Sequence, residues 1–195
     1  TWDRLVPLSG VERIMVVTGR AHRAAVEEQL PELLDPNVVL ESEPKDSSAA
    51  IGLAAAILLR REPDVIVGSF AAERYLAGGD HLWNGGMFIA RADVLLAQLG
   101  EAEPALLAGL TELAEAWDTP RRGAVVDRVW PGLTKVAIDY TVAEPAAAAG
   151  KLVVIPGDFD WDDVGDFASI AKLHSGGRKS DLAILGENAR VLADA

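Results

Sequence analysis

The stretch Ile14-Met15-Val16-Val17-Thr18-Gly19 decides the fold, because a short apolar, β-branched run closed by glycine is typical of a buried β-strand. Residues 21–30 follow with helix-forming composition and are ended by a proline. The same order then returns, with a strand predicted over 37–41, a helix over 47–61 and a third strand over 65–68. This alternation of strand and helix with short connections predicts a parallel α/β sheet with helices on both faces.

Beyond residue 72 the regular repeat is lost, and the remaining elements are predicted one by one from composition and periodicity. We expect a strand at 87–89, helices at 92–99 and 104–117, a strand at 152–155 and a helix over about 164–173.

The charge balance and the absence of cysteine exclude several classes of protein. The 195 residues carry 18 basic and 30 acidic side chains, and this net charge of -12 disfavours nucleic acid and anionic membrane surfaces as partners. A phosphorylated ligand would need a divalent cation and backbone N–H groups beside it. Without cysteine there is no disulfide, thiolate zinc site or thiol nucleophile. No apolar run approaches the ~18 residues that span a bilayer, and Thr1-Trp2-Asp3-Arg4 is no signal peptide, so a cytoplasmic protein is predicted.

Three polar segments are candidates for chemistry, and each has a purely structural alternative. Residues 158–163 place four carboxylates just beyond a predicted strand, which suits one or two contacts to magnesium or, alternatively, a solvated acidic turn. Residues 41–48 precede a buried helix, and they form either a nucleotide-side loop or a plain capping loop. Residues 82–88 hold paired glycines and Asn84, which suits a sugar contact or a tight turn into the next strand.

In their order along the chain, these segments resemble the bacterial mannose-1-phosphate guanylyltransferases, relatives of the wider sugar-nucleotide pyrophosphorylase family. Lys45-Asp46-Ser47-Ser48-Ala49-Ala50-Ile51 is similar to the family's Arg-Asn-Thr-Ala-x-Ala-Ile loop, although Asp46 replaces the usual asparagine. Trp83-Asn84-Gly85-Gly86-Met87-Phe88 matches Trp-Asn-x-Gly-Met-Phe and is the most specific motif. Ile138-Asp139-Tyr140-Thr141-Val142-Ala143-Glu144 looks like Ile-Asp-Tyr-x-Val-x-Glu, and Trp161-Asp162-Asp163-Val164-Gly165 looks like Trp-x-Asp-Val-Gly.

The resemblance implies a fold, a reaction and a set of site residues. The fold would be a Rossmann-like mixed, mostly parallel sheet of the nucleotidyltransferase (GT-A-like) type, flanked by helices. The reaction would join GTP and mannose-1-phosphate to give GDP-mannose and pyrophosphate, with Mg²⁺ as cofactor. Asp163 would be the catalytic metal ligand. Nucleotide binding would fall to Glu41, Lys45, Asp46 and Ser47, and sugar binding to Asn84, Gly85, Asp139 and Glu144.

The family's Gly-rich, triphosphate-wrapping loop has no counterpart in this sequence. We therefore expect residues 1–185 to be a nucleotidyltransferase domain without that loop and without a segment between 72 and 73, which would include the family's other metal-binding aspartate. Residues 186–195 look like the start of a truncated C-terminal β segment. Exposed apolar elements next to these gaps would be either uncovered core or an interface, such as that of a homodimer.

Three alternatives stay open from the sequence. A sister enzyme could use another nucleotide or hexose phosphate, since Asp46 departs from the family's pattern at the base-side loop. A non-catalytic relative could bind sugar nucleotides as a regulator. A plain α/β interaction domain would require three matched motifs to be coincidental.

Overall fold

The computed structural model describes residues 2–70 and 86–155. The chain divides into two units, the first made of residues 1–69 and 88–154. The second, residues 70–87 and 155–195, falls almost wholly outside the described residues, and the helix predicted over 164–173 falls there with it. The account below therefore concerns the first unit.

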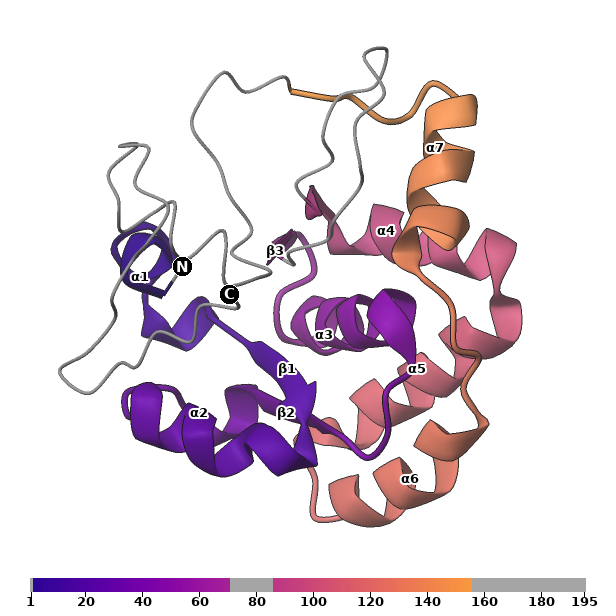
Figure 1. Cartoon of the computed structure of the whole chain (residues 1–195). Coiled ribbons are helices and arrows are strands. Elements are labelled where there is room, and N and C mark those ends of the chain that lie inside the picture. The colour runs from indigo at the N-terminus through magenta and orange to yellow at the C-terminus, as the bar shows by residue number, and fades with distance from the viewer. Residues whose placement is uncertain (1, 71–85, 156–195) are drawn as a thin grey trace, which may run out of the picture. The chain divides into compact units, whose positions relative to one another are not determined.

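The described elements alternate strands and helices in the first half of the chain and are helical in the second (Figure 1). Their bounds are α1 Trp2–Ser9, η1 Val11–Arg13, β1 Val16–Gly19, η2 Arg20–His22, α2 Arg23–Gln29, η3 Asp35–Asn37, β2 Val38–Glu41, α3 Asp46–Arg61, β3 Ile66–Phe70, β4 Met87–Arg91, α4 Ala92–Ala102, α5 Pro104–Trp117, α6 Arg122–Val129, η4 Trp130–Gly132, the π-helix η5 Asp139–Ala143 and α7 Glu144–Ala148.

The strands form two pairs, and the α/β class expected from the sequence is confirmed. β1 and β2 pair in parallel, with Val16 opposite Val38 and Gly19 opposite Glu41. β3 pairs with β4 in a second two-stranded sheet, so the three consecutive strands do not make one continuous sheet within the described residues. Because of the parallel register, β1 and β2 end together, and the loops that follow them start from the same edge.

The strand predicted at 152–155 is wrong: the chain is extended there but makes no strand. Val153 and Val154 are 87% and 64% exposed. An apolar, β-branched run becomes a strand only when its backbone N–H and C=O groups find a neighbouring strand. No described strand pairs with these residues. The sequence pattern is typical of a strand, but none of the described strands lies beside this segment to pair with it.

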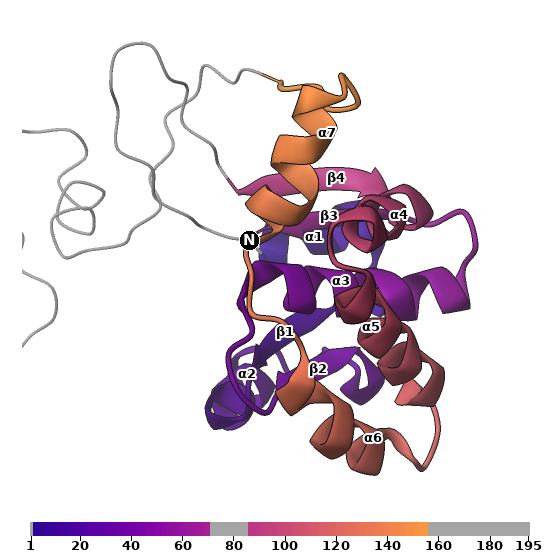
Figure 2. The ribbon, with the colours of Figure 1, turned by 90° about the vertical axis from the view of Figure 1, so that its right-hand side faces the viewer.

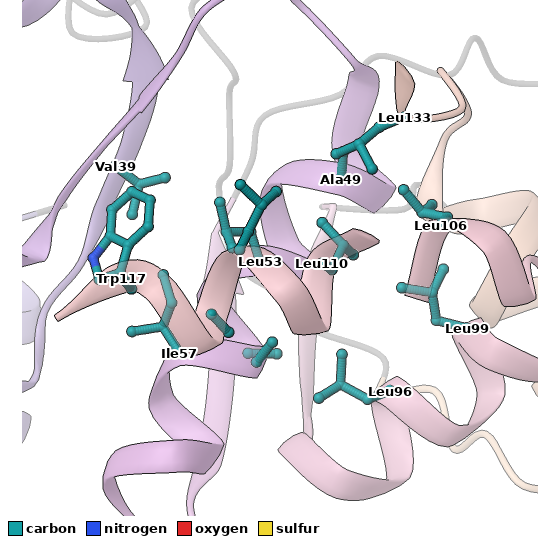
Figure 3. Close-up of a cluster of buried hydrophobic side chains, with 14 of the residues drawn as sticks. Val39, Ala49, Leu53, Ile57, Leu96, Leu99, Leu106, Leu110, Trp117 and Leu133 are labelled. Atoms are coloured by element: carbon teal, nitrogen blue, oxygen red, sulfur yellow. The ribbon is translucent and has the colours of Figure 1, made fainter. Parts of the chain in front are cut away.

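Helix α3 is the centre of the unit, as its largely apolar sequence predicts (Figure 2). It packs against α4 and α5 on one side and meets β1 on the other. Figure 3 shows Leu53 and Ile57 of α3 among Leu99, Leu110 and Trp117 of the neighbouring helices. All five are at most 4% exposed. Burying each aliphatic side chain of this kind contributes about 1.5–3 kcal/mol, so this contact dominates the stability of the unit.

The C-terminal end of α3 is anchored by polar contacts made by Arg61. Its guanidinium donates to both carboxylate oxygens of Asp118, at 2.8 and 3.2 Å, and to Asn37 Oδ1 at 2.9 Å. The ion pair holds the pKa of Asp118 below its ordinary value. A cation at this end also meets the partial negative charge of the helix C-terminus favourably. The helix is thus fixed to η3 and to the residue after α5.

One face of the β3–β4 pair is apolar and uncovered. Val67 faces the core, whereas Ile66 and Ile89 are 66% and 71% exposed. Whether this face is uncovered core or an interface, the two alternatives given by the sequence, stays a prediction. Among the helices of residues 2–70 and 86–155, none combines the length and the hydropathy needed to cross a bilayer.

Gly52 is predicted to be essential to the packing of α3. A Cβ at this position would lie 2.6 Å from Leu110 Cδ1 and 2.9 Å from Leu99 Cδ2, and both leucines are fully buried. The overlap should outweigh the gain in helix propensity, so Gly52→Ala should destabilise the fold by about 1–2 kcal/mol. Urea denaturation measures this. Gly123→Ala in α6 is the matched control, since a Cβ there meets nothing within 4 Å, and it should gain up to about 1 kcal/mol. Equal effects of the two substitutions would contradict the packing argument.

Candidate functional site

Glu41 ends β2 at the edge where ligands collect in α/β proteins. It lies opposite Gly19 in the parallel register, so both strands deliver their following loops to this edge. The side chain is half-buried, and burial raises the pKa of its carboxyl group. Within the described residues no cation or hydrogen-bond donor pairs with that carboxylate. A partly desolvated, unpaired acid costs stability, and groups held at such a cost mark functional sites.

Ser42, the next residue, has a second unsatisfied polar group. Its Oγ is buried and makes no hydrogen bond. Buried hydroxyls nearly always have a partner, and leaving one unpaired costs about 1–3 kcal/mol. Glu41 and Ser42 therefore both hold polar atoms that have no partner within residues 2–70 and 86–155.

The rest of this loop is held firmly against η4. Trp130 is 1% exposed, and its Nε1 donates to the Glu43 carbonyl at 2.8 Å. Lys45 Nζ donates to the Pro131 carbonyl at 2.6 Å and pairs with the Glu43 carboxylate at 2.8 Å. Since the Lys45 side chain is only 11% exposed, its ammonium group is committed to holding the loop in this conformation. Contact of Lys45 with a nucleotide stays a prediction. The contact would require the ammonium group to give up its hydrogen bond to the Pro131 carbonyl.

Asp46 has the left-handed backbone conformation at the start of α3, with φ of 70°. Its Oδ1 accepts a hydrogen bond from the Ser47 N–H at 2.8 Å. Asparagine and aspartate are the side-chain-bearing residues that adopt this conformation most readily, because they hydrogen-bond locally. The backbone therefore explains why Asp46 can replace the family's asparagine, independently of any contact with a base.

Three hydrogen bonds connect the N-terminus of α3 to the segment that leads into the π-helix η5. Ser47 Oγ accepts from the Ile138 N–H at 2.9 Å, and the Ser48 N–H donates to the Val136 carbonyl at 3.2 Å. The hydroxyls of Ser48 and Thr141 are 2.8 Å apart, and both residues are at most 3% exposed. The N–H groups of Ser47 and Ser48 thus have partners inside the protein, which weakens the expectation that this helix end binds phosphate.

The structure brings part of the predicted site together. Asp139, half-buried, opens η5, and the exposed Glu144 begins α7, so these two sugar-side residues follow the segment bonded to α3. Of the predicted nucleotide-side residues, Ser47 lies at the other end of these bonds. Asn84, Gly85 and Asp163 lie outside the described residues.

Within residues 2–70 and 86–155, no group of three or more histidine, aspartate or glutamate side chains could hold a metal ion. No chemical step is therefore derived through a metal from these residues. The predicted ligand, Asp163, lies outside them.

Sequence reasoning missed Trp130, and although it placed Ser48 and Thr141 within candidate motifs, it did not predict their contact. Ser48 and Thr141 are 93 positions apart and Trp130 is 87 positions from Glu43, so local patterns could not pair them. Two hollows on the described surface lie away from these residues, one between α2 and Val38 and one between α4 and α5.

Comparison with known proteins identifies relatives over part of the chain. No protein-family profile matches it. It is 33% identical over 128 residues to the xanthan biosynthesis protein XanB of Xanthomonas campestris pv. campestris (strain B100), covering 64% of the chain and 25% of that relative. It is 36% identical over 100 residues to the mannose-1-phosphate guanylyltransferase ManC of Salmonella typhimurium (strain LT2), covering 51% of the chain and 20% of that relative. The chain thus spans about a quarter or less of the length of these curated relatives.

A solved structure shares the fold. The protein titled mannose-1-phosphate geranyltransferase from Thermus thermophilus superposes with a TM-score of 0.61 at 20% identity, covering 89% of this chain and 67% of that one. At this identity the match shows that the two proteins share an α/β fold and nothing finer.

The backbone at Asp46 yields a prediction about side-chain shape. A β-branched residue is strained at positive φ, so Asp46→Val should lower the free energy of unfolding by about 1–2 kcal/mol. Asp46→Asn, the matched control, should change it by less than about 0.5 kcal/mol. Chemical denaturation monitored by tryptophan fluorescence distinguishes them. Equal stability of the two variants would mean that residue 46 does not hold the left-handed conformation.

Burial of Glu41 yields a prediction about pH. Because its pKa is higher in the folded than in the unfolded state, the folded protein binds the proton more tightly. The carboxylate therefore destabilises the fold above the folded-state pKa, and the penalty disappears below the unfolded value, near 4.5. Glu41→Gln should raise the free energy of unfolding at about pH 7, and the gain should shrink at about pH 4. Glu28→Gln, on the exposed face of α2, is the surface control and should change the free energy of unfolding at about pH 7 by less than about 0.5 kcal/mol. A gain for Glu41→Gln that is independent of pH would contradict the titration of Glu41.

Proposed function

We propose that this chain, a relative of the sugar-nucleotide pyrophosphorylase family, forms part of a mannose-1-phosphate guanylyltransferase. The reaction would convert GTP and mannose-1-phosphate into GDP-mannose and pyrophosphate, in the cytoplasm. The names of the relatives support a nucleotidyltransferase acting on a mannose phosphate. The choice of guanine as the base and of mannose-1-phosphate as the acceptor goes beyond this support and is proposed here.

The half-buried carboxylate of Glu41, which has no partner in the described part of the chain, is the observation that carries the nucleotide side of this proposal. A carboxylate accepts hydrogen bonds through both of its oxygens. Guanine offers two adjacent donors on one edge, the ring N1–H and the 2-amino group. Adenine, cytosine and uracil do not offer this pair of donors. Glu41 could therefore select GTP, and binding would supply the partner that the fold leaves out.

The chemistry would be an in-line displacement at phosphorus. A phosphate oxygen of mannose-1-phosphate attacks the α-phosphorus of GTP, a new P–O bond forms, and the bond between the α-phosphorus and the bridging oxygen breaks. The electron pair leaves with pyrophosphate. Such a reaction depends on positioning and charge neutralisation more than on a nucleophilic side chain. We expect Asp163 to hold Mg²⁺, which would supply positive charge next to the phosphates. The chain itself has few basic groups to spare for this, since its net charge is -12.

The sugar side of the site would be formed by Asp139 and Glu144 together with Asn84 and Gly85. Carboxylates accept hydrogen bonds from sugar hydroxyls, and an amide can both donate and accept. The bonds that join α3 to the residues before Asp139 support the idea that nucleotide and sugar meet between these segments.

Pyrophosphate release by the whole protein tests the proposal. With Mg²⁺ and mannose-1-phosphate, release is expected with GTP and not with ATP, CTP or UTP. Glu41→Gln should lower kcat/KM for GTP by at least about tenfold. The glutamine amide keeps only one acceptor oxygen, so it cannot accept hydrogen bonds from both guanine donors as a carboxylate can. Asp163→Ala should abolish release, and Glu28→Gln should leave it unchanged.

Other outcomes would identify a different function. Release only with another nucleotide, or only with another hexose phosphate, would reveal a sister enzyme. A folded protein that releases no pyrophosphate under any condition but binds GDP-mannose would be the sugar-nucleotide-binding regulator.

A further inference from the structure

The bonds between α3 and the residues before η5 suggest a role for Ser47 different from nucleotide contact. Its side chain is half-buried, and its Oγ accepts from the Ile138 N–H at 2.9 Å. Ile138 is 2% exposed and directly precedes Asp139. The hydroxyl therefore holds the backbone from which a sugar-side carboxylate projects.

Two further contacts make this connection specific. The next N–H of α3, that of Ser48, bonds the Val136 carbonyl, and the Ser48 hydroxyl meets Thr141 within η5 itself. Consecutive residues of one helix end thus hold positions 136, 138 and 141. We call this set of contacts the α3–η5 latch, made of Ser47, Ser48, Val136, Ile138 and Thr141.

The conformation that the latch holds is an unusual one. η5 is a π-helix of five residues, Asp139–Ala143, which then continues as α7. A π-turn fits one more residue into the turn than an α-helix does, is rarely stable by itself, and is often found at functional sites. A shift of one residue in a helix turns each side chain by about 100°, so hydrogen bonds that hold the backbone at the first turn of η5 restrict the directions in which its side chains can project.

We propose that Ser47 is a positioning residue for the sugar-phosphate side of the site. Together with the buried Ser48–Thr141 pair, it sets the position of η5 and hence of Asp139. This inference rests on the proposed function. It connects the nucleotide-side loop to the sugar side: a displacement of the α3 N-terminus by a bound nucleotide is transmitted to the residues that bind the sugar phosphate.

The kinetic test separates positioning from nucleotide contact. Ser47→Ala should raise KM for mannose-1-phosphate about three- to tenfold, the change expected from one lost hydrogen bond, while KM for GTP stays within about twofold. Ser47→Thr, which keeps an oxygen acceptor, should restore the original value. A rise in KM for GTP alone would overturn the proposal and make Ser47 a nucleotide contact.

A second measurement does not depend on activity. Amide hydrogen exchange of Ile138 should become faster in Ser47→Ala and return towards the original rate in Ser47→Thr. Ser42→Ala, in the same loop but without a hydrogen bond, should leave that rate unchanged. Unchanged exchange in Ser47→Ala would refute the latch. Faster exchange in a protein that releases no pyrophosphate would instead show that the latch exists and that the proposed reaction is wrong.

The buried pair provides a check by double-mutant cycle. Thr141→Val alone leaves the Ser48 hydroxyl buried without a partner, whereas combining it with Ser48→Ala removes both polar groups. The single variant should speed exchange at Ile138 more than the double variant does. Equal or greater exchange in the double variant would refute the contribution of the pair to the latch.

Discussion

The close approach of α3 to α4 and α5 is the constraint on which the rest of this unit depends. Gly52 permits it, because the leucine side chains of the two neighbouring helices occupy the space where a Cβ would stand. Once α3 is held there, its two ends are placed as well. Arg61 joins one end to Asp118, and Ser47 and Ser48 join the other to the segment before the π-helix. Hydrophobic burial therefore provides the stability, and polar contacts at the helix ends determine which loops meet.

Polar residues around the N-terminus of α3 divide into two groups with opposite energetics. Lys45 and Ser47 have partners inside the protein, so removing their polar groups would loosen the loop. Glu41 and Ser42 hold polar atoms that have no partner among the residues that the structure describes, at a cost to stability. A fold tolerates such a cost where binding restores it, which is why the second group carries the proposed nucleotide contact. The first group keeps the geometry in which that contact can be made.

A strongly acidic chain that handles phosphorylated substrates must confine positive charge to a small region. The described part of the site offers little positive charge to a phosphate. Lys45 is paired with Glu43, and the first N–H groups of α3 already donate hydrogen bonds within the protein. The triphosphate would therefore be held by other groups, in agreement with the family's use of a separate Gly-rich loop and a metal ion. Under the proposed function, residues 2–70 and 86–155 would contact the base and the sugar, and other groups would bind the phosphates.

Local sequence determined most of the elements: the runs near residues 16, 38 and 66 became strands, and the alanine- and leucine-rich segments became α3, α4 and α5. The prediction of a strand at 152–155 failed, because a strand needs a neighbouring strand to pair with and the propensity of the segment itself gives no information on that neighbour. Motif resemblance indicated Glu41 and Asp139 as site residues. Tertiary structure alone revealed that Lys45 faces Pro131 and that Ser48 meets Thr141 across 93 positions. Periodicity reports how each segment packs with its immediate neighbours, whereas these hydrogen bonds exist only after distant segments have been brought together by the burial of α3.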